Sequence, residues 1–148
     1  MIGLGFLMAA CMAAGQAQAV LGESAASVDS DRKALSAVKR STEIRNTYTI
    51  QEFSSDSVIV REYVSSSGIV FGIAWNGLTH PDLTQLLGSY VSEYRDALQK
   101  IPRKSGTRRL KVKTERIVVE KWGHMRNLRG RAYAPALVPS EVSVHEIR

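Results

Sequence analysis

The span 58–88 constrains the fold of this chain most strongly, because it combines two strand patterns, two turn signals and a helix start. Residues 58–64 carry β-branched and aromatic side chains on both faces, which is typical of a central antiparallel strand. A Ser-Ser-Ser-Gly turn follows, and residues 69–75 form a second, nearly continuous apolar strand that ends at an Asn-Gly dipeptide. The span therefore predicts a hairpin that leads into a helix.

The helix predicted over residues 83–99 carries one wide apolar stripe. Thr79 and Asp82 resemble a capping box at its start, and Pro81 suits the first turn of a helix. The stripe consists of Leu83, Leu86, Leu87, Tyr90, Val91, Tyr94, Ala97 and Leu98. Seven of them are expected to be buried: Leu83, Leu86, Leu87, Tyr90, Val91, Tyr94 and Leu98. Their expected strand partners are Ile59, Val70, Ile73, Trp75, Leu110 and Val118.

Further strands are predicted at 48–53, 110–114 and 117–122, and Gly123 is expected to end the last of them. A short amphipathic helix is predicted over residues 28–40, with Lys and Arg in its last turn. The sequence thus predicts an α+β fold. An antiparallel sheet of about five strands would pack against one long amphipathic helix, with a short N-terminal helix beside it.

Residues 1–19 are typical of an export signal. Their apolar core is too short to span a bilayer comfortably, and Ala17-Gln18-Ala19 is a small-x-small cleavage site. We therefore expect cleavage after Ala19 and a periplasmic or secreted protein. No Lys or Arg precedes the apolar core, which a misassigned start codon would explain. The alternative is a buried N-terminal helix of the mature fold.

The mature chain, residues 20–148, has the length of one domain and contains no cysteine. Thiol catalysis, cysteine-bound zinc and disulfides are therefore excluded for it. The only cysteine, Cys11, lies in the export segment. The residues around it resemble a lipoprotein signal only faintly. The cysteine lies too close to the start, and the usual leucine is missing. Lipidation of Cys11 is kept as an alternative.

Charge is distributed unevenly along the chain. Residues 95–131 hold 13 Lys or Arg and 3 Asp or Glu, whereas residues 20–94 hold 6 basic and 9 acidic side chains. A basic half of this kind attracts anions without specifying which. Nucleic acid is not an expected partner, because an exported protein rarely meets it and no aromatic-rich platform accompanies the charge.

A candidate anion site lies in the segment HMRNLRGR, which is predicted to be a glycine-containing loop. Its guanidinium groups could converge on a phosphate or carboxylate. The candidate residues are His124, Arg126, Arg129 and Arg131. The alternative interpretation is a solvated basic face with ordinary ion pairs to Glu115 and Glu120.

No catalytic residue, metal site or cofactor site is predicted. The histidines, His80, His124 and His145, do not form a metal-ligand motif on one element, and the serines at 65–67 are typical of a turn and not of a nucleophile elbow. Trp75 and Trp122 both end strands, where each is expected to close the core, although either could form a binding platform.

Three blocks, VREYVSSSGIVFGIAW, PDLTQLLGSY and GHMRNLRGRAYAPALVP, resemble in this order a bacterial exported family known as domain of unknown function 2844. The resemblance covers essentially the mature chain. The chain departs from it at Leu78 and Thr79, where the family often has Gly-Pro. The resemblance implies a signal peptide and brings no activity, cofactor or catalytic residue.

Two classes of function remain open. The first is a non-enzymatic exported binding or accessory protein whose basic half holds an acidic envelope component, such as a polysaccharide or lipid headgroup, or an acidic protein. The second is a small envelope hydrolase or transferase with a site near His124, Glu120 and Arg126. The first is favoured because no catalytic apparatus is apparent. Once processed, the protein is not expected to be integral to the membrane.

Overall fold

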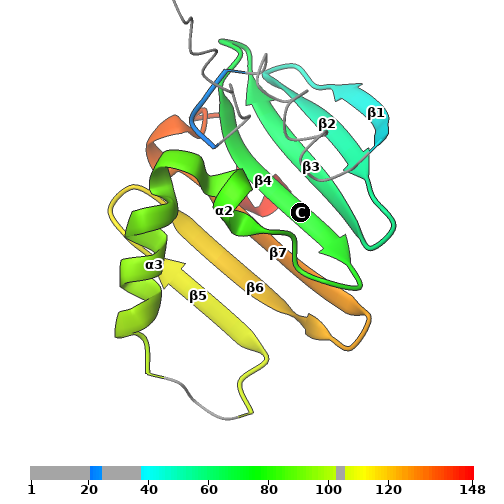
Figure 1. Ribbon diagram of the computed structural model, residues 1–148. Coiled ribbons are helices and arrows are strands. Elements are labelled where there is room, and N and C mark those ends of the chain that lie inside the picture. The colour runs from blue at the N-terminus through cyan, green and yellow to red at the C-terminus, as the bar shows by residue number, and fades with distance from the viewer. Residues whose placement is uncertain (1–20, 25–37, 103–105) are drawn as a thin grey trace, which may run out of the picture.

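Two hairpins form the centre of the fold, one over residues 58–77 and one over residues 118–133. They are joined through the strand that follows the Ser-Ser-Ser-Gly turn. In the computed structural model, which describes residues 21–24, 38–102 and 106–148, this strand pairs with its sequence neighbour on one side and with a strand from the C-terminal half on the other. The result is one seven-stranded antiparallel sheet in the order β1-β2-β3-β4-β7-β6-β5 (Figure 1). Its strands are β1 (Val38–Ile44), β2 (Tyr48–Ser54), β3 (Val58–Ser65), β4 (Val70–Gly77), β5 (Arg109–Lys113), β6 (Val118–His124) and β7 (Asn127–Tyr133).

The prediction of about five strands is wrong, because β1 and β7 were missed. The strands predicted at 48–53 and 58–64 correspond to β2 and β3, which pair with each other. The strand predicted at 117–122 continues through Gly123 to His124, so Gly123 does not end it. The segment predicted to be a loop forms β7, which pairs with both β4 and β6.

The predicted N-terminal helix over residues 28–40 is not borne out where the structure describes it. Residues 28–37 lie outside the described ranges, and Val38 begins strand β1, which pairs with β2. Pairing with a neighbouring strand decides the conformation here, because tertiary hydrogen bonds override a weak local helical preference.

The long helix is divided at Gly88. Helix α2 (Leu83–Leu87) ends at this glycine, whose φ of 43° lies in the left-handed region that L side chains avoid. A 3₁₀ turn, η2 (Gly88–Tyr90), then leads into α3 (Val91–Lys100). The N-cap is Asp82, whose carboxylate accepts a hydrogen bond from the Thr84 amide at 2.8 Å, so the expected capping box from Thr79 is wrong.

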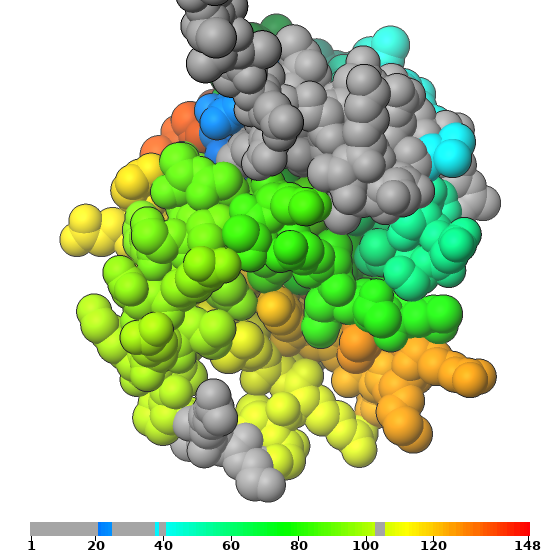
Figure 2. All heavy atoms as spheres, in the orientation of Figure 1, coloured from blue at the N-terminus to red at the C-terminus, as the bar shows by residue number. Residues whose placement is uncertain are grey.

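The helices cover one face of the sheet, as Figures 1 and 2 show from that side. Leu83, Leu86 and Leu87 are buried there, whereas Leu98 is 36% exposed, so its expected burial is wrong. Tyr90 and Val91 are only partly buried. The facing strand residues include Val70, Ile73, Trp75, Val112 and Val119. Of the expected partners, Val118 packs on the opposite face, and Ile59 belongs to neither core cluster.

Trp75 closes the core on the helical face. Its indole lies where a side chain at residue 130 would stand, since a Cβ on Gly130 would be 2.2 Å from Trp75 Cζ2. The indole Nε1 donates a hydrogen bond to His80 Nδ1 at 2.8 Å. Burial, and then the charge of Lys121, hold the pKa of His80 below its usual range. His80 is thus a packing partner of the tryptophan.

The C-terminal segment, residues 134–148, covers part of the opposite face. It includes two short 3₁₀ turns, η3 (Pro135–Leu137) and η4 (Val144–Glu146). Ile147 is fully buried over Gly72, where a Cβ would be 2.8 Å from the isoleucine side chain. The Tyr63 hydroxyl donates to the Arg148 carbonyl at 2.9 Å and accepts from the Arg148 amide at 3.0 Å. The segment is therefore held by packing and by hydrogen bonds.

Candidate functional site: a basic groove on the sheet

Cross-strand register places several polar side chains in one line on the sheet face opposite the helices. Asn76 of β4 pairs with Arg129 of β7, Arg129 pairs with Trp122 of β6, and Trp122 pairs with Arg109 of β5. Side chains at paired positions lie on the same face, with Cβ atoms about 5 Å apart. We call these four residues, Asn76, Arg129, Trp122 and Arg109, the open row.

Within the described part of the chain, no carboxylate pairs with either arginine of the open row. Among the ion pairs between described residues, none includes Arg109 or Arg129. Both side chains are exposed. The Arg129 Nε donates a hydrogen bond to Asn127 Oδ1 at 3.1 Å, and this partner is a neutral amide. Two guanidinium groups therefore flank Trp122 with their charge available to a ligand.

In the next row along the strands, each arginine or lysine is paired with a carboxylate. Arg131 Nε lies 2.6 Å from Glu120 Oε2, and Lys111 Nζ lies 2.8 Å from Glu120 Oε1. Burial opposes ionisation of Glu120, but the hydrogen bonds from Lys111 and Arg131 outweigh it and leave the pKa of this carboxyl below its usual range. On β3, Arg61 pairs with Glu52 at 2.8 Å. This row has a structural role, and it bounds the open row.

A groove of about 860 Å³ runs beside the open row, and a hollow of about 420 Å³ adjoins it. Trp122 and Arg148 line both, and Trp122 is only partly buried. The groove has two acidic side chains, and each is engaged: Glu43 pairs with Arg45, and Glu146 accepts a hydrogen bond from the Tyr48 hydroxyl at 2.8 Å. The groove is lined by Glu43, Arg45, Tyr48, Ile50, Arg61, Tyr63, Trp75, Asn76, Trp122, Arg129, Gly130, His145, Glu146 and Arg148.

The structure separates the four residues of the predicted anion site. Arg129 lies in the groove, whereas Arg131 is paired with Glu120 and also donates to the Val144 carbonyl at 2.7 Å. Arg126 lies at the tip of the β6–β7 hairpin, and His124 precedes that tip, with its Nδ1 3.0 Å from Arg108 Nη1. The three arginines do not converge, because two of them lie on a strand and the third on its turn.

The residues of the hydrolase alternative are not brought together either. Glu120 and His124 lie four positions apart on β6, which corresponds to roughly 13 Å along a strand. Glu120 is engaged by Arg131 and Lys111, and Arg126 lies beyond His124 at the hairpin tip. The described geometry thus provides no acid–base pair at this place.

Sequence reasoning missed Asn76 and Arg109 as site residues. Asn76 was assigned to a turn, and Arg109 was counted only as part of the basic half. The signal that could have found Arg109 is the alternation of Arg109, Lys111 and Lys113 with Leu110 and Val112, which predicts a strand with one cationic face.

Within residues 21–24, 38–102 and 106–148, no group of three or more His, Cys, Asp or Glu side chains is arranged to hold a metal ion. The helices in the same ranges are all too short or too polar to cross a membrane.

The fold and the groove define a class: a seven-stranded antiparallel-sheet protein with helices on one face and a basic, tryptophan-containing groove on the other. Within it, the chain belongs to the family described as protein of unknown function (DUF2844), whose family model matches residues 17–147. The resemblance to this family is thereby confirmed. No curated protein and no solved structure matches the chain.

Proposed function

We propose that this protein is exported and acts as a non-enzymatic binding protein for an acidic glycan of the bacterial cell envelope, which it holds in the basic groove. The observation that carries the proposal is the open row, in which Arg109 and Arg129 flank Trp122 on one sheet face and form no ion pair with a carboxylate among the described residues. Charge and a flat aromatic surface are therefore offered to one ligand.

The chemistry of the row suits a sugar acid. A guanidinium group forms two parallel hydrogen bonds with a carboxylate or sulfate, and an ammonium cannot reproduce that geometry. The partly exposed indole of Trp122 offers an apolar surface with a polar edge, on which the carbon face of a sugar ring can rest. An acidic peptide would use the arginines equally well but has no comparable need for the tryptophan.

The sequence of residues 1–19 supports export, and the position of Leu21 bears on where cleavage can occur. This leucine is fully buried in the core on the helical face, and its amide donates to the Leu86 carbonyl at 3.1 Å. A chain that begins at Val20 would therefore retain a residue that the fold uses, so cleavage after Ala19 is compatible with the described packing.

Calorimetric titration tests this function. The protein is titrated with heparin oligosaccharides, with polygalacturonate oligomers and with a neutral oligosaccharide of similar length. We expect binding to the acidic glycans only, with affinity that falls as salt rises, because exposed charges are screened beyond about 10 Å at 0.1 M ionic strength. Equal binding to the neutral oligosaccharide, or no binding to either acidic glycan, would contradict the proposal.

A further inference from the structure

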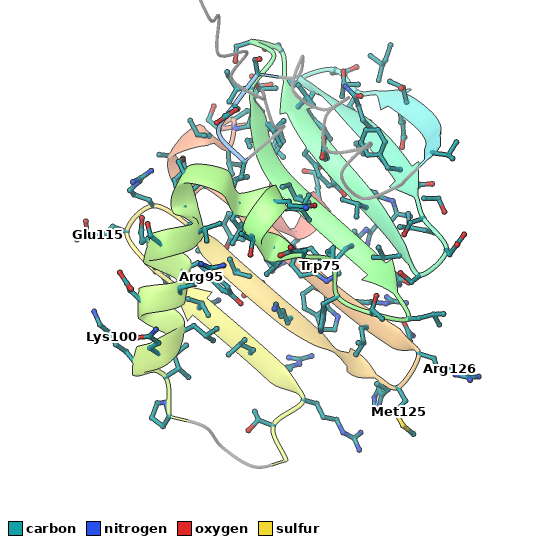
Figure 3. The ribbon with its side chains drawn as sticks, in the orientation of Figure 1. Trp75, Arg95, Lys100, Glu115, Met125 and Arg126 are labelled. Atoms are coloured by element: carbon teal, nitrogen blue, oxygen red, sulfur yellow. The ribbon has the colours of Figure 1, made fainter. Side chains whose placement is uncertain are left out.

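A second surface, at the tip of the β6–β7 hairpin, carries apolar and cationic side chains that do not line the groove. Met125 stands at the tip of the β6–β7 hairpin and is 94% exposed. Figure 3 shows Met125 and Arg126 at this tip, and in Figure 2 the orange atoms of the hairpin project at the lower right of the molecule. An exposed thioether chain at a projecting tip contributes nothing to the core.

Two further segments join the hairpin at this end. Leu78, which follows β4, is 53% exposed, and Arg108 precedes β5. They share with the hairpin a shallow hollow of about 730 Å³, which is lined by Leu78, Arg108, Gly123, His124, Met125, Arg126 and Leu128. Three of these side chains are apolar, two are arginines, and none is acidic.

The backbone at the tip adopts a costly conformation. Arg126 has a φ of 63°, and it is the only non-glycine residue with a positive φ among the residues described. Glycine would occupy this left-handed position with less strain. The turn therefore holds a long cationic side chain at a position where the backbone alone would favour glycine. This property also supplies a useful test variant, because Arg126→Gly removes the cation without straining the turn.

We propose that the hairpin tip, with Leu78 and Arg108, is a docking surface for a bilayer that contains anionic lipid. Met125 and Leu78 enter the headgroup region, and Arg108 and Arg126 face the lipid phosphates. Anionic membrane surfaces attract basic segments, and exposed apolar side chains beside the cations add affinity once they leave water. The proposal does not rest on the groove, since Arg129 and Trp122 line a different hollow.

The shape of the surface favours a bilayer over a protein partner. A stable protein interface buries about 800 Å² on each side and needs a broad complementary patch. Here two strongly exposed apolar side chains lie on a hairpin tip and its neighbouring turn, and two arginines line the same hollow. Such a tip can enter a soft headgroup layer without requiring a matching pocket.

Vesicle co-sedimentation tests the proposal. The full chain is mixed with phosphatidylcholine vesicles and with vesicles that also contain phosphatidylglycerol. We expect binding to the anionic vesicles only, a loss of roughly fivefold in affinity for Arg126→Gln and for Arg126→Gly, and a clear loss for Met125→Ser. Two exposed residues of α3, Lys100 and Leu98, supply the matched controls. The variants Lys100→Gln and Leu98→Ser should bind the vesicles as the unchanged protein does.

The remaining outcomes decide against the proposal. Equal binding to both kinds of vesicle, no binding to either, or unchanged binding by Met125→Ser would overturn it. A loss caused by Arg129→Gln in place of Arg126→Gln would assign the lipid headgroup to the groove. Dimerisation of the unchanged protein that Met125→Ser abolishes, measured by sedimentation velocity without lipid, would make the tip an interface between two copies. Thermal melts show that each variant is folded, and Arg126→Gly should melt at or above the temperature of the unchanged protein.

Discussion

Arg129 of β7 and Trp122 of β6 occupy directly paired positions, on the sheet face that the helices leave uncovered. The pairing places a guanidinium group beside an indole at the edge of one groove. The two side chains can therefore act on one ligand, and their substitutions should have coupled effects on binding.

The two tryptophans should respond in opposite ways to truncation. Trp75→Ala should cost about 3–5 kcal/mol of unfolding free energy, because the indole is 3% exposed and fills the space over Gly130. Trp122→Ala should leave stability nearly unchanged and weaken binding of an acidic glycan. Chemical denaturation and calorimetric titration of both variants check this. A destabilisation of Trp122→Ala as large as that of Trp75→Ala would show that both residues belong to the core.

Truncation within the helical stripe should depend on position. Leu87→Ala should lose about 2–5 kcal/mol, because this side chain is fully buried between α2 and the sheet. Leu98→Ala is the matched control and should lose much less, since Leu98 is 36% exposed near the end of α3. Urea denaturation of the two variants measures the difference. Equal losses would contradict the packing of α2 on the sheet described above.

Alkaline pH should destabilise the fold through its buried tyrosines. Burial, and then the hydrogen bond to Glu146, raise the pKa of Tyr48 to about 12, and burial raises the pKa of Tyr63 as well. The unfolded chain loses these protons near pH 10, about two units earlier than folded Tyr48 does. The stabilisation is therefore complete below about pH 10 and is lost as the pH rises toward 12.

Denaturant titrations at a series of alkaline pH values measure this effect, and Tyr48→Phe serves as the comparison. The phenylalanine variant should lose less stability between about pH 9 and pH 12, because it has one tyrosine fewer to titrate. If the stability of Tyr48→Phe depended on pH as that of the unchanged protein does, titration of Tyr48 would not be a cause of the alkaline destabilisation.

Export should produce a chain that begins at or near Val20. Ala17 and Ala19 fit the small pockets of a signal peptidase, and Leu21 is the first described residue with a place in the core. N-terminal sequencing of protein from the periplasm or the culture medium checks the cleavage position. Soluble cytoplasmic protein that retains Met1 would contradict export.

Strands β2, β3 and β4 were predictable, because they are rich in β-branched and aromatic side chains and are joined by clear turns. Strand β7 was not predictable, because Gly130 lies in its middle and is typical of a loop. The structure gives the reason for that glycine: the Trp75 indole occupies the space of a side chain at this position. The contact with Trp75, which is distant in the sequence, thus explains a glycine in the middle of a strand, which the local sequence pattern could not explain.

Of the candidate site, only the positive charge could be predicted from the sequence. The excess of Lys and Arg in residues 95–131 indicated a basic surface. Which arginines keep their charge available depends on cross-strand register, which pairs Arg131 with Glu120 and leaves Arg129 opposite Trp122. Register follows from the whole sheet, so no local motif could separate these two residues.

The most direct test of the central claim compares the affinity of Arg129→Lys and Arg95→Lys for heparin oligosaccharides by calorimetric titration. Both substitutions keep the charge, but Arg95 is exposed on α3, on the opposite side of the sheet (Figure 3). Arg129→Lys should weaken binding roughly tenfold, because a paired charge-assisted hydrogen bond is lost, whereas Arg95→Lys should bind as the unchanged protein does. Equal affinities of both variants and the unchanged protein would contradict a built site and reduce the groove to a charged surface.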